Sequence, residues 1–194
     1  PETMVYHKSR TLFALNIAKK SKKRRYILCE GYMDVISMHE AGFDTAVCAC
    51  GTALTPEQAK LLSEYADEVV LSYDSDEAGQ KATERSLGIL GSTTLKVSVL
   101  SYQGAKDPDE FIKKYGRERF EMLLNGTANP TEFQLKKAKS KYDLRSDDGR
   151  LSYIREAIDI LTERGVSPTA RDVYAGRLAD ETGVSKQAIV SQMQ

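Results

Sequence analysis

The sequence predicts an α/β fold, a parallel sheet with flanking helices, followed by an all-α helical bundle. Three successive stretches each pass from a short apolar run through a turn into a helical pattern: "RRYILCEGYMDVISMHEAG", "DTAVCACGTALTPEQAKLLSEYA" and "DEVVLSYDSDEAGQKATERSLGILG". A fourth apolar run, "TLKVSVLSY", closes the series. Strands that alternate with helices favour parallel pairing, because each crossover then contains a helix. After Tyr102 no strand-like run follows, which indicates helices alone.

Local signals justify the helices in order. The first should follow the turn at Gly31 and end near Gly42. The second should begin with Thr55 as N-cap and Pro56 at the first helical position, with Gln58 completing a capping box. Three helices with Ser or Asp starts and Gly stops are expected near the end of the chain, in "DDGRLSYIREAIDILTERG", "SPTARDVYAGRLADETG" and "SKQAIVSQMQ".

These patterns divide the chain into a lead-in over residues 1–25, an α/β domain over 26–127 and a helical part over 128–194. The lead-in contains one acid, Glu2, and eight basic residues: Lys8, Arg10, Lys19, Lys20, Lys22, Lys23, Arg24 and Arg25. Such a segment either contacts phosphates or forms a solvated basic face, and its composition alone leaves both readings open.

Composition narrows the class of protein. Lys and Arg together number 28 and so do Asp and Glu, so the whole chain does not indicate a polyanionic partner. Three cysteines without a CxxC motif, beside only two histidines, argue against a zinc site and for reduced thiols in the core. The longest stretch without a charged residue, 45–56, is too short to span a membrane. We expect a cytoplasmic protein.

Six carboxylates fall at the predicted strand ends or just beyond them. They form three close pairs in sequence: Glu30 with Asp34, Asp74 with Asp76, and Asp107 with Asp109. Right-handed crossovers put the carboxyl ends of parallel strands at one edge of the sheet, where ligands bind. We therefore expect the three pairs to meet there.

A divalent cation would explain this gathering of like charges. Two carboxylates about 4 Å apart repel by roughly 4 kcal/mol at an effective dielectric constant of 20. Oxygen ligands without nearby His or Cys suit Mg²⁺ or Mn²⁺. Each pair alone has a structural explanation, since Asp76 could cap the following helix and "KDPDEF" could be a solvated turn before a helix that starts at Pro108. All three pairs together favour a metal site.

Four motifs resemble the Toprim domain of bacterial DnaG-type primases: "EGYMDV" (30–35), "GTALT" (51–55), "YDSDEAG" (73–79) and "KDPDEF" (106–111). "PETMVYHKS" is similar to the segment before Toprim in that family, and the helical part to the bundle that completes its RNA-polymerase domain. The resemblance implies a Toprim fold, which is a Rossmann-like parallel sheet with flanking helices, over 26–127. It also implies a helical bundle subdomain over 128–194.

The resemblance also implies roles for individual residues. Glu30, Asp74 and Asp76 would be catalytic, binding two or more Mg²⁺ or Mn²⁺ ions together with Asp34, Asp107 and Asp109. Whether Glu30 is a ligand or a base stays open. No zinc is expected in this stretch. Ser75 stands where many relatives have Gly. The residues expected to contact nucleic acid or nucleotide are Lys8, Arg10, Gly51, Thr52 and Lys106.

The implied activity is template-directed synthesis of short RNA primers on single-stranded DNA, by nucleotidyl transfer. The implied partners are the DNA template, ribonucleoside triphosphates, the RNA–DNA hybrid and a replicative helicase, the last through a domain expected to be absent here. We expect a cytoplasmic, nucleoid-associated bacterial protein with no membrane contact. We also expect a piece of a longer enzyme, weakly active or inactive by itself.

Three alternatives stay open. A Toprim nuclease or topoisomerase would share the Glu and DxD motifs, although no tyrosine of the ten can be singled out as a nucleophile. A phosphoacceptor signalling domain would have its acidic pair after the first strand, whereas here the DxD pair follows the third. A non-catalytic module for nucleic-acid or helicase interaction would use the helical part.

Overall fold

The computed structural model describes residues 3–4, 6–49, 53–163 and 166–193. The chain forms two compact units, Pro1–Pro130 and Thr131–Gln194. The predicted site lies in the first unit.

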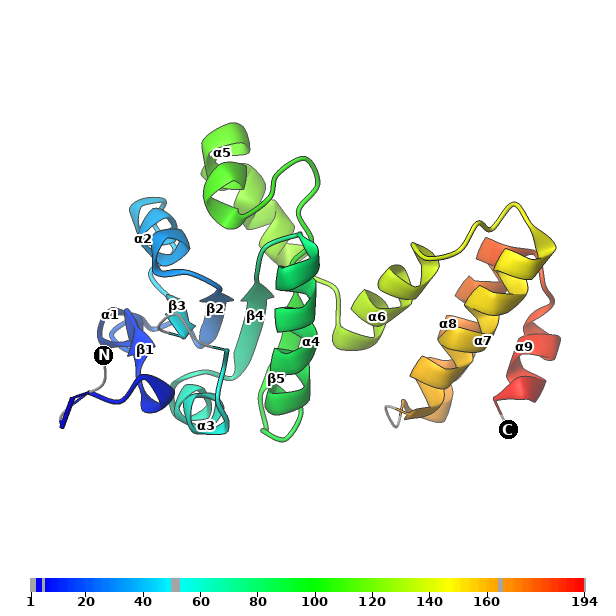
Figure 1. Cartoon of the computed structure of the whole chain (residues 1–194), viewed down its shortest axis with the longest axis horizontal. Helices are drawn as coiled ribbons and strands as arrows, with labels where there is room; N and C mark the ends of the chain where they lie inside the picture. Colours follow the sequence, from blue (N-terminus) through cyan, green and yellow to red (C-terminus); the bar gives the residue numbers. More distant parts are fainter. Residues whose placement is uncertain (1–2, 5, 50–52, 164–165, 194) are drawn as a thin grey trace. The chain divides into compact units, whose positions relative to one another are not determined.

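The first unit is built on a sheet of five described strands in the order β1-β3-β2-β4-β5 (Figure 1). The predicted parallel pairing is confirmed, since β3, β2, β4 and β5 run parallel. The structure adds an edge strand, β1, which pairs antiparallel with β3. The bounds are Leu12–Phe13 for β1, Arg25–Cys29 for β2, Ala46–Ala49 for β3, Glu68–Ser72 for β4 and Lys96–Val99 for β5.

The two central strands, β2 and β4, set the position of the site. They pair in register from Arg25 opposite Glu68 to Cys29 opposite Ser72. The last four residues of each strand are buried, because helices cover both faces of the sheet. The chain therefore leaves both strands at the same level, with Glu30 directly after the first of them.

The helices of this unit form two layers. Helix α2 (Tyr32–Glu40) packs with α5 (Pro108–Asn125) on one side of the sheet. Helices α3 (Pro56–Tyr65) and α4 (Glu77–Leu90) pack together on the other side (Figure 1). Helix α5 is interrupted by a kink at Gly116, where the glycine has a φ of 80° that other residues rarely adopt. Phe111 and Phe120 of α5 form an aromatic cluster with Phe43 and Tyr102.

The start of α3 holds the lead-in in place. The predicted capping box is confirmed: the Gln58 N–H donates to the Thr55 Oγ1 at 3.1 Å, and the Thr55 N–H donates to the Gln58 Oε1 at 3.0 Å. The buried Gln58 amide nitrogen also donates to the carbonyl oxygens of Lys8 and Thr11, each at 2.8 Å. These bonds anchor a short 3-10 helix, η1 (Lys8–Arg10), before β1, and α1 (Leu15–Ala18) follows β1.

The second unit is helical. Its main core includes Leu135, Tyr153, Leu161, Leu178 and Ile189. Two of the predicted helix starts are confirmed, because the side chains of Ser167 and Ser185 cap helices. One predicted stop is confirmed at Gly183, which ends a helix with a φ of 73°. The described helices are α6 (Pro130–Lys139), α7 (Asp147–Glu163), α8 (Pro168–Thr182) and α9 (Lys186–Gln192). Across the described residues, no helix combines the length and apolar character needed to cross a bilayer.

Candidate active site

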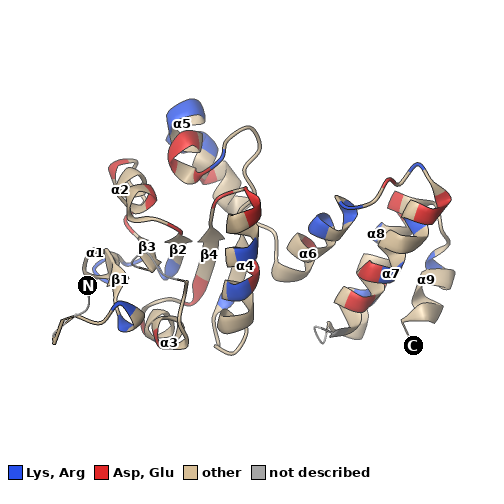
Figure 2. Ribbon diagram, in the orientation of Figure 1, with Lys and Arg blue, Asp and Glu red and all other residues tan. Residues whose placement is uncertain are grey.

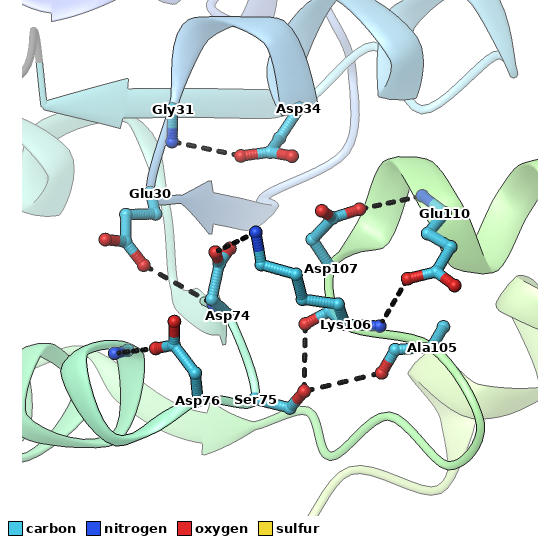
Figure 3. Close-up of polar contacts among 11 residues, drawn as sticks. Glu30, Gly31, Asp34, Asp74, Ser75, Asp76, Ala105, Lys106, Asp107 and Glu110 are labelled. Atoms are coloured by element: carbon cyan, nitrogen blue, oxygen red, sulfur yellow. Dashed lines mark hydrogen bonds and ion pairs between the residues drawn. The ribbon is translucent and has the colours of Figure 1, made fainter.

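The candidate site lies where the chain leaves β2 and β4. The connection from β2 turns to one side of the sheet and that from β4 to the other, which makes this point the switch in the topology where α/β folds bind ligands. Figure 2 shows acidic residues at these strand ends and at the start of α5. The backbone N–H of Asp74 donates to the Glu30 Oε2 at 3.4 Å, which joins the two strand ends (Figure 3).

Asp34 lies in the first turn of α2, facing the same edge. Its Oδ2 accepts a hydrogen bond from the Gly31 N–H at 3.1 Å, closing the turn that starts the helix. The pKa of the Asp34 carboxyl is raised to about 6, first by burial and then by the negative charges of Asp107, Asp74 and Asp109, against the lowering effect of the Gly31 hydrogen bond. The acids of three segments therefore act on one another electrostatically.

Asp74 is the most connected acid of the group. Burial, followed by the charge of Glu30, raises the pKa of the Asp74 carboxyl, and the charges of Asp107 and Asp76 act in the same direction. Lys106 opposes them, because its Nζ lies 3.8 Å from the Asp74 Oδ2. The Asp74 side chain is 22% exposed, so it is open to an ion from solvent.

Asp76 caps α4, as predicted. Its Oδ1 accepts from the Gly79 N–H at 2.8 Å. Gly79 itself is a residue that the sequence reasoning missed. A Cβ added there would lie 2.1 Å from the Asp74 carbonyl oxygen, so only glycine lets α4 start this close to the turn formed by Asp74, Ser75 and Asp76. The available signal was a glycine in the first helical turn, where helix formation alone does not require one.

The "KDPDEF" motif, whose first two residues precede α5 and whose other four begin it, is fixed through its backbone against the turn Asp74–Asp76, called the DSD turn below. Ser75 donates to the Lys106 carbonyl oxygen twice, from its N–H at 2.9 Å and from its Oγ at 3.0 Å (Figure 3). The Lys106 N–H donates to the Glu110 Oε2 at 2.8 Å, and the Glu110 N–H donates to the Asp107 Oδ1 at 2.7 Å. The motif is therefore held on both sides, while the Lys106 side chain projects toward the acids.

Asp109 is engaged differently from the other acids. Its Oδ2 lies 2.6 Å from the Nζ of Lys113, one turn further along α5. This hydrogen bond and one with Ser37 of α2 lower the pKa of the Asp109 carboxyl. The structure thus places Asp109 near Asp34, as part of a contact between α5 and α2.

The predicted basic and turn residues are only partly brought to the acids. Lys106 lies beside Asp74. Lys8 and Arg10 lie in η1, next to the start of α3. Gly51 and Thr52 fall outside the described residues.

The acidic side chains are not arranged to coordinate a metal ion in this structure. Within the described ranges, no group of three or more His, Cys, Asp or Glu side chains is placed to hold a metal ion. The carboxylates have other partners in this structure. Asp34, Asp76 and Asp107 each use one oxygen on a backbone N–H at a helix start, whereas Asp74 and Asp109 face lysines.

The chemistry of the group nevertheless fits a hard divalent cation. All six side chains offer carboxylate oxygens, and an acid that caps a helix through one oxygen keeps the other for an ion. Burial is the main cause of the raised pKa values of Asp34 and Asp74, and the neighbouring carboxylates add to it by a charge repulsion that an ion would relieve.

The raised pKa of Asp34 predicts that stability depends on pH. The folded chain holds this proton more tightly than the unfolded chain, so stability should fall as the pH rises from about 4 to 6. Without divalent ions, Asp34→Asn should leave stability unchanged at pH 4 and raise it by about 1 kcal/mol at pH 7.5, a value reduced for solvent screening. Urea unfolding at both pH values measures this. The exposed Asp159→Asn is the control for loss of one charge, and an equal gain at both pH values for Asp34→Asn would contradict the prediction.

Two family models match successive parts of the chain. Residues 27–112 match the model described as Toprim-like. Residues 131–187 match the model described as the DnaB-helicase binding domain of primase. The second match differs from the expectation that a helicase-binding domain would be absent, since it falls on the helical unit itself.

Curated relatives match almost all of the chain. A DNA primase of Clostridium acetobutylicum is 38% identical over 190 residues, which cover 97% of this chain and 32% of that protein. A DNA primase of Enterococcus faecalis is 35% identical over 196 residues, which cover 99% of this chain and 31% of that protein. The chain thus spans about a third of the length of these relatives.

Solved structures agree with these matches. The zinc-binding and RNA polymerase domains of Aquifex aeolicus primase align with a TM-score of 0.70 at 30% identity, covering 98% of this chain and 46% of that one. The RNA polymerase domain of Mycobacterium tuberculosis primase DnaG, in complex with a double-stranded DNA oligomer with a 6-nucleotide overhang, aligns with a TM-score of 0.77 at 30% identity. That alignment covers 95% of this chain and 60% of the other. The chain therefore contains a Toprim-like region followed by primase-type helices, and it is similar to DNA primases over almost its whole length.

Proposed function

We propose that this chain is part of the catalytic core of a primase that synthesises short RNA primers on a single-stranded DNA template. The observation that carries the proposal is the junction of three acidic segments at the switch between β2 and β4. There the Asp74 N–H donates to Glu30, and Ser75 holds the backbone of Lys106 beside them through two hydrogen bonds. In the proposed reaction a 3′-hydroxyl attacks the α-phosphorus of a ribonucleoside triphosphate, and pyrophosphate leaves.

Glu30, Asp74 and Asp76 would hold Mg²⁺ or Mn²⁺, with Asp34, Asp107 and Asp109 around them. When bound, two or more such ions lower the pKa of the attacking hydroxyl and neutralise charge on the triphosphate. Lys106 supports the same reading, because its Nζ beside Asp74 places a mobile cation where triphosphate oxygens would arrive. Its backbone is fixed by Ser75 and Glu110, so only the side chain has to turn from acid to phosphate.

The lead-in supplies the proposed nucleic-acid contacts that lie within the described residues, while Gly51 and Thr52, also expected to make such contacts, lie outside them. One solved DnaG primase catalytic domain, 26% identical, is bound to single-stranded DNA, and the Mycobacterium tuberculosis domain is in complex with overhanging duplex. In this chain, Lys8 and Arg10 lie on η1, which the start of α3 holds firmly. We propose that they contact phosphates of the template.

The test is ribonucleotide incorporation on single-stranded DNA by a full-length primase that carries these residues, with and without Mn²⁺ or Mg²⁺. We expect primers to form only with the metal, and the same preparation to leave supercoiled plasmid intact. Cleavage of the plasmid without primer synthesis would favour the nuclease or topoisomerase alternative. We also expect the chain by itself to bind Mn²⁺ while making little or no primer.

A second candidate role belongs to the helical unit. Its match to the DnaB-helicase binding domain of primase favours a contact with the replicative helicase. The solved primase catalytic and RNA polymerase domains also align over 95% or more of this chain, so the same helices are part of those domains. Failure of purified helicase to bind the immobilised chain would remove this second role.

A further inference from the structure

Beside the acids lies an exposed apolar surface that the proposed catalytic residues do not use. We call it the aromatic patch and define it as Phe13, Tyr32, Met33 and Ile36. The ring of Phe13, from β1, meets the ring of Tyr32, from α2, edge to face with centroids 6.2 Å apart. Tyr32 is 56% exposed and Met33 64% exposed. Large apolar side chains gathered at a surface indicate a binding partner.

The patch follows from the periodicity of α2. This helix buries Val35 and Met38 against the sheet, so that Tyr32, Met33 and Ile36 are left on its outer side. Packing within the first unit therefore does not explain them. Tyr32 also follows Glu30 by two residues, immediately after the Gly31 turn. A molecule lying on the patch would reach the acidic edge.

The lead-in segment that contains Phe13 is rich in basic residues. Lys23, Arg24 and Arg25 of this segment pair with acids of the sheet region. The exposed residues closer to Phe13 and α1 have no ion pair within the described part of the chain; these are Arg10, Lys19, Lys20 and Lys22. Figure 2 shows basic positions along this part of the ribbon. The patch is thus apolar and aromatic, and its Phe13 belongs to a segment that carries exposed positive charge.

We propose that the aromatic patch binds single-stranded nucleic acid, with a base stacked on Tyr32 and Phe13 and the adjoining phosphates near Lys19 and Lys20. Stacking on aromatic rings beside cations is how proteins hold single strands without reading their sequence. An apolar protein partner would satisfy the rings but would leave the exposed basic residues without a role. This inference rests on the proposed function, and it adds a positioning role for two residues outside the acidic group.

The absence of tryptophan from the chain makes a direct test possible. Tyr32→Trp introduces a single indole into the patch, and oligodeoxythymidine should quench its emission by stacking, in a saturable manner that weakens with salt. Met122→Trp is the matched control. Met122 is also exposed, and its neighbour Leu124 contacts Arg25 at the opposite end of β2. Its emission should not change.

Affinity provides the second readout. By fluorescence anisotropy with labelled oligodeoxythymidine, Tyr32→Ala or Phe13→Ala should weaken binding at least 5-fold, as expected for one lost stacking contact. Tyr32→Phe keeps the ring and should retain affinity, and circular dichroism checks the fold of each variant.

Four outcomes separate the possibilities. Quenching together with weakened binding supports the proposal. Unchanged emission and affinity while the wild type still binds DNA would overturn it and leave the proposed function standing. Wild-type chain that binds no DNA would count against both. Patch variants that alter self-association rather than DNA binding would show that a second copy covers the surface.

Discussion

Replacing Asp74 with Ala in a full-length primase should lower primer synthesis by about 1,000-fold or more while leaving the fold intact. Asp74 joins the three acidic segments: its N–H contacts Glu30 and its carboxylate faces Lys106. In the proposed reaction Asp74 is a ligand of the metal that activates the attacking hydroxyl, and losing such a ligand removes several kcal/mol of transition-state stabilisation. The side chain caps no helix, so the free energy of unfolding should change little. Primer extension and urea unfolding measure the two effects.

Asp76 provides the contrast, because it also caps α4 through the Gly79 N–H. Asp76→Asn retains an oxygen that can accept this bond, so it should weaken the metal site with little loss of stability. Asp76→Ala should also cost about 1 kcal/mol of stability, the usual cost of a lost cap. Full primer synthesis by either the Asp74→Ala or the Asp76→Ala enzyme would contradict the metal assignment.

The second large effect is expected at Gly79, a residue with no charge or chemistry of its own. In Gly79→Ala the new Cβ would lie 2.1 Å from the backbone oxygen of Asp74, so the first turn of α4 and the DSD turn must move apart. We expect a loss of about 2–3 kcal/mol of stability, measured by urea unfolding of this chain. Because the movement displaces Asp74 and Asp76, affinity for Mn²⁺ should fall as well.

Gly88 lies in the same helix and gives a matched control. A Cβ at Gly88 meets no atom within 4 Å, and the residue is exposed. Gly88→Ala should therefore raise stability by about 0.5–1 kcal/mol through helix propensity alone, without changing Mn²⁺ affinity. If the two substitutions had equal effects, the close approach at Gly79 would not be what positions the acids.

Elements with a strong local signal could be predicted from the sequence. The four parallel strands are short apolar runs, and the helix starts at Thr55 and Asp76 carry their caps in the sequence itself. Parallel topology then brings the three acidic segments to one edge, as expected. The edge strand Leu12–Phe13 escaped prediction because two residues are too few to show any periodicity.

Within the site, contacts between distant segments were not predictable. The approach of Gly79 to the Asp74 carbonyl and the contact of Ser75 with the Lys106 carbonyl depend on how α4 and α5 pack on the sheet. The pairing of Asp109 with Lys113 is a local signal, since the two lie four residues apart on one helix. The acidic motif nevertheless favoured reading Asp109 only as a metal ligand.

The caps at Asp34, Asp76 and Asp107 have a mechanical consequence. Each carboxylate accepts a hydrogen bond at the amino end of a different helix, α2, α4 or α5, and each keeps a second oxygen for the proposed ions. Ions bound there would link the starts of the three helices, and the coupling is reciprocal. A change that loosens one of these helix starts should therefore also lower the affinity for metal. Metal affinity then depends on how well the helices pack on both faces of the sheet.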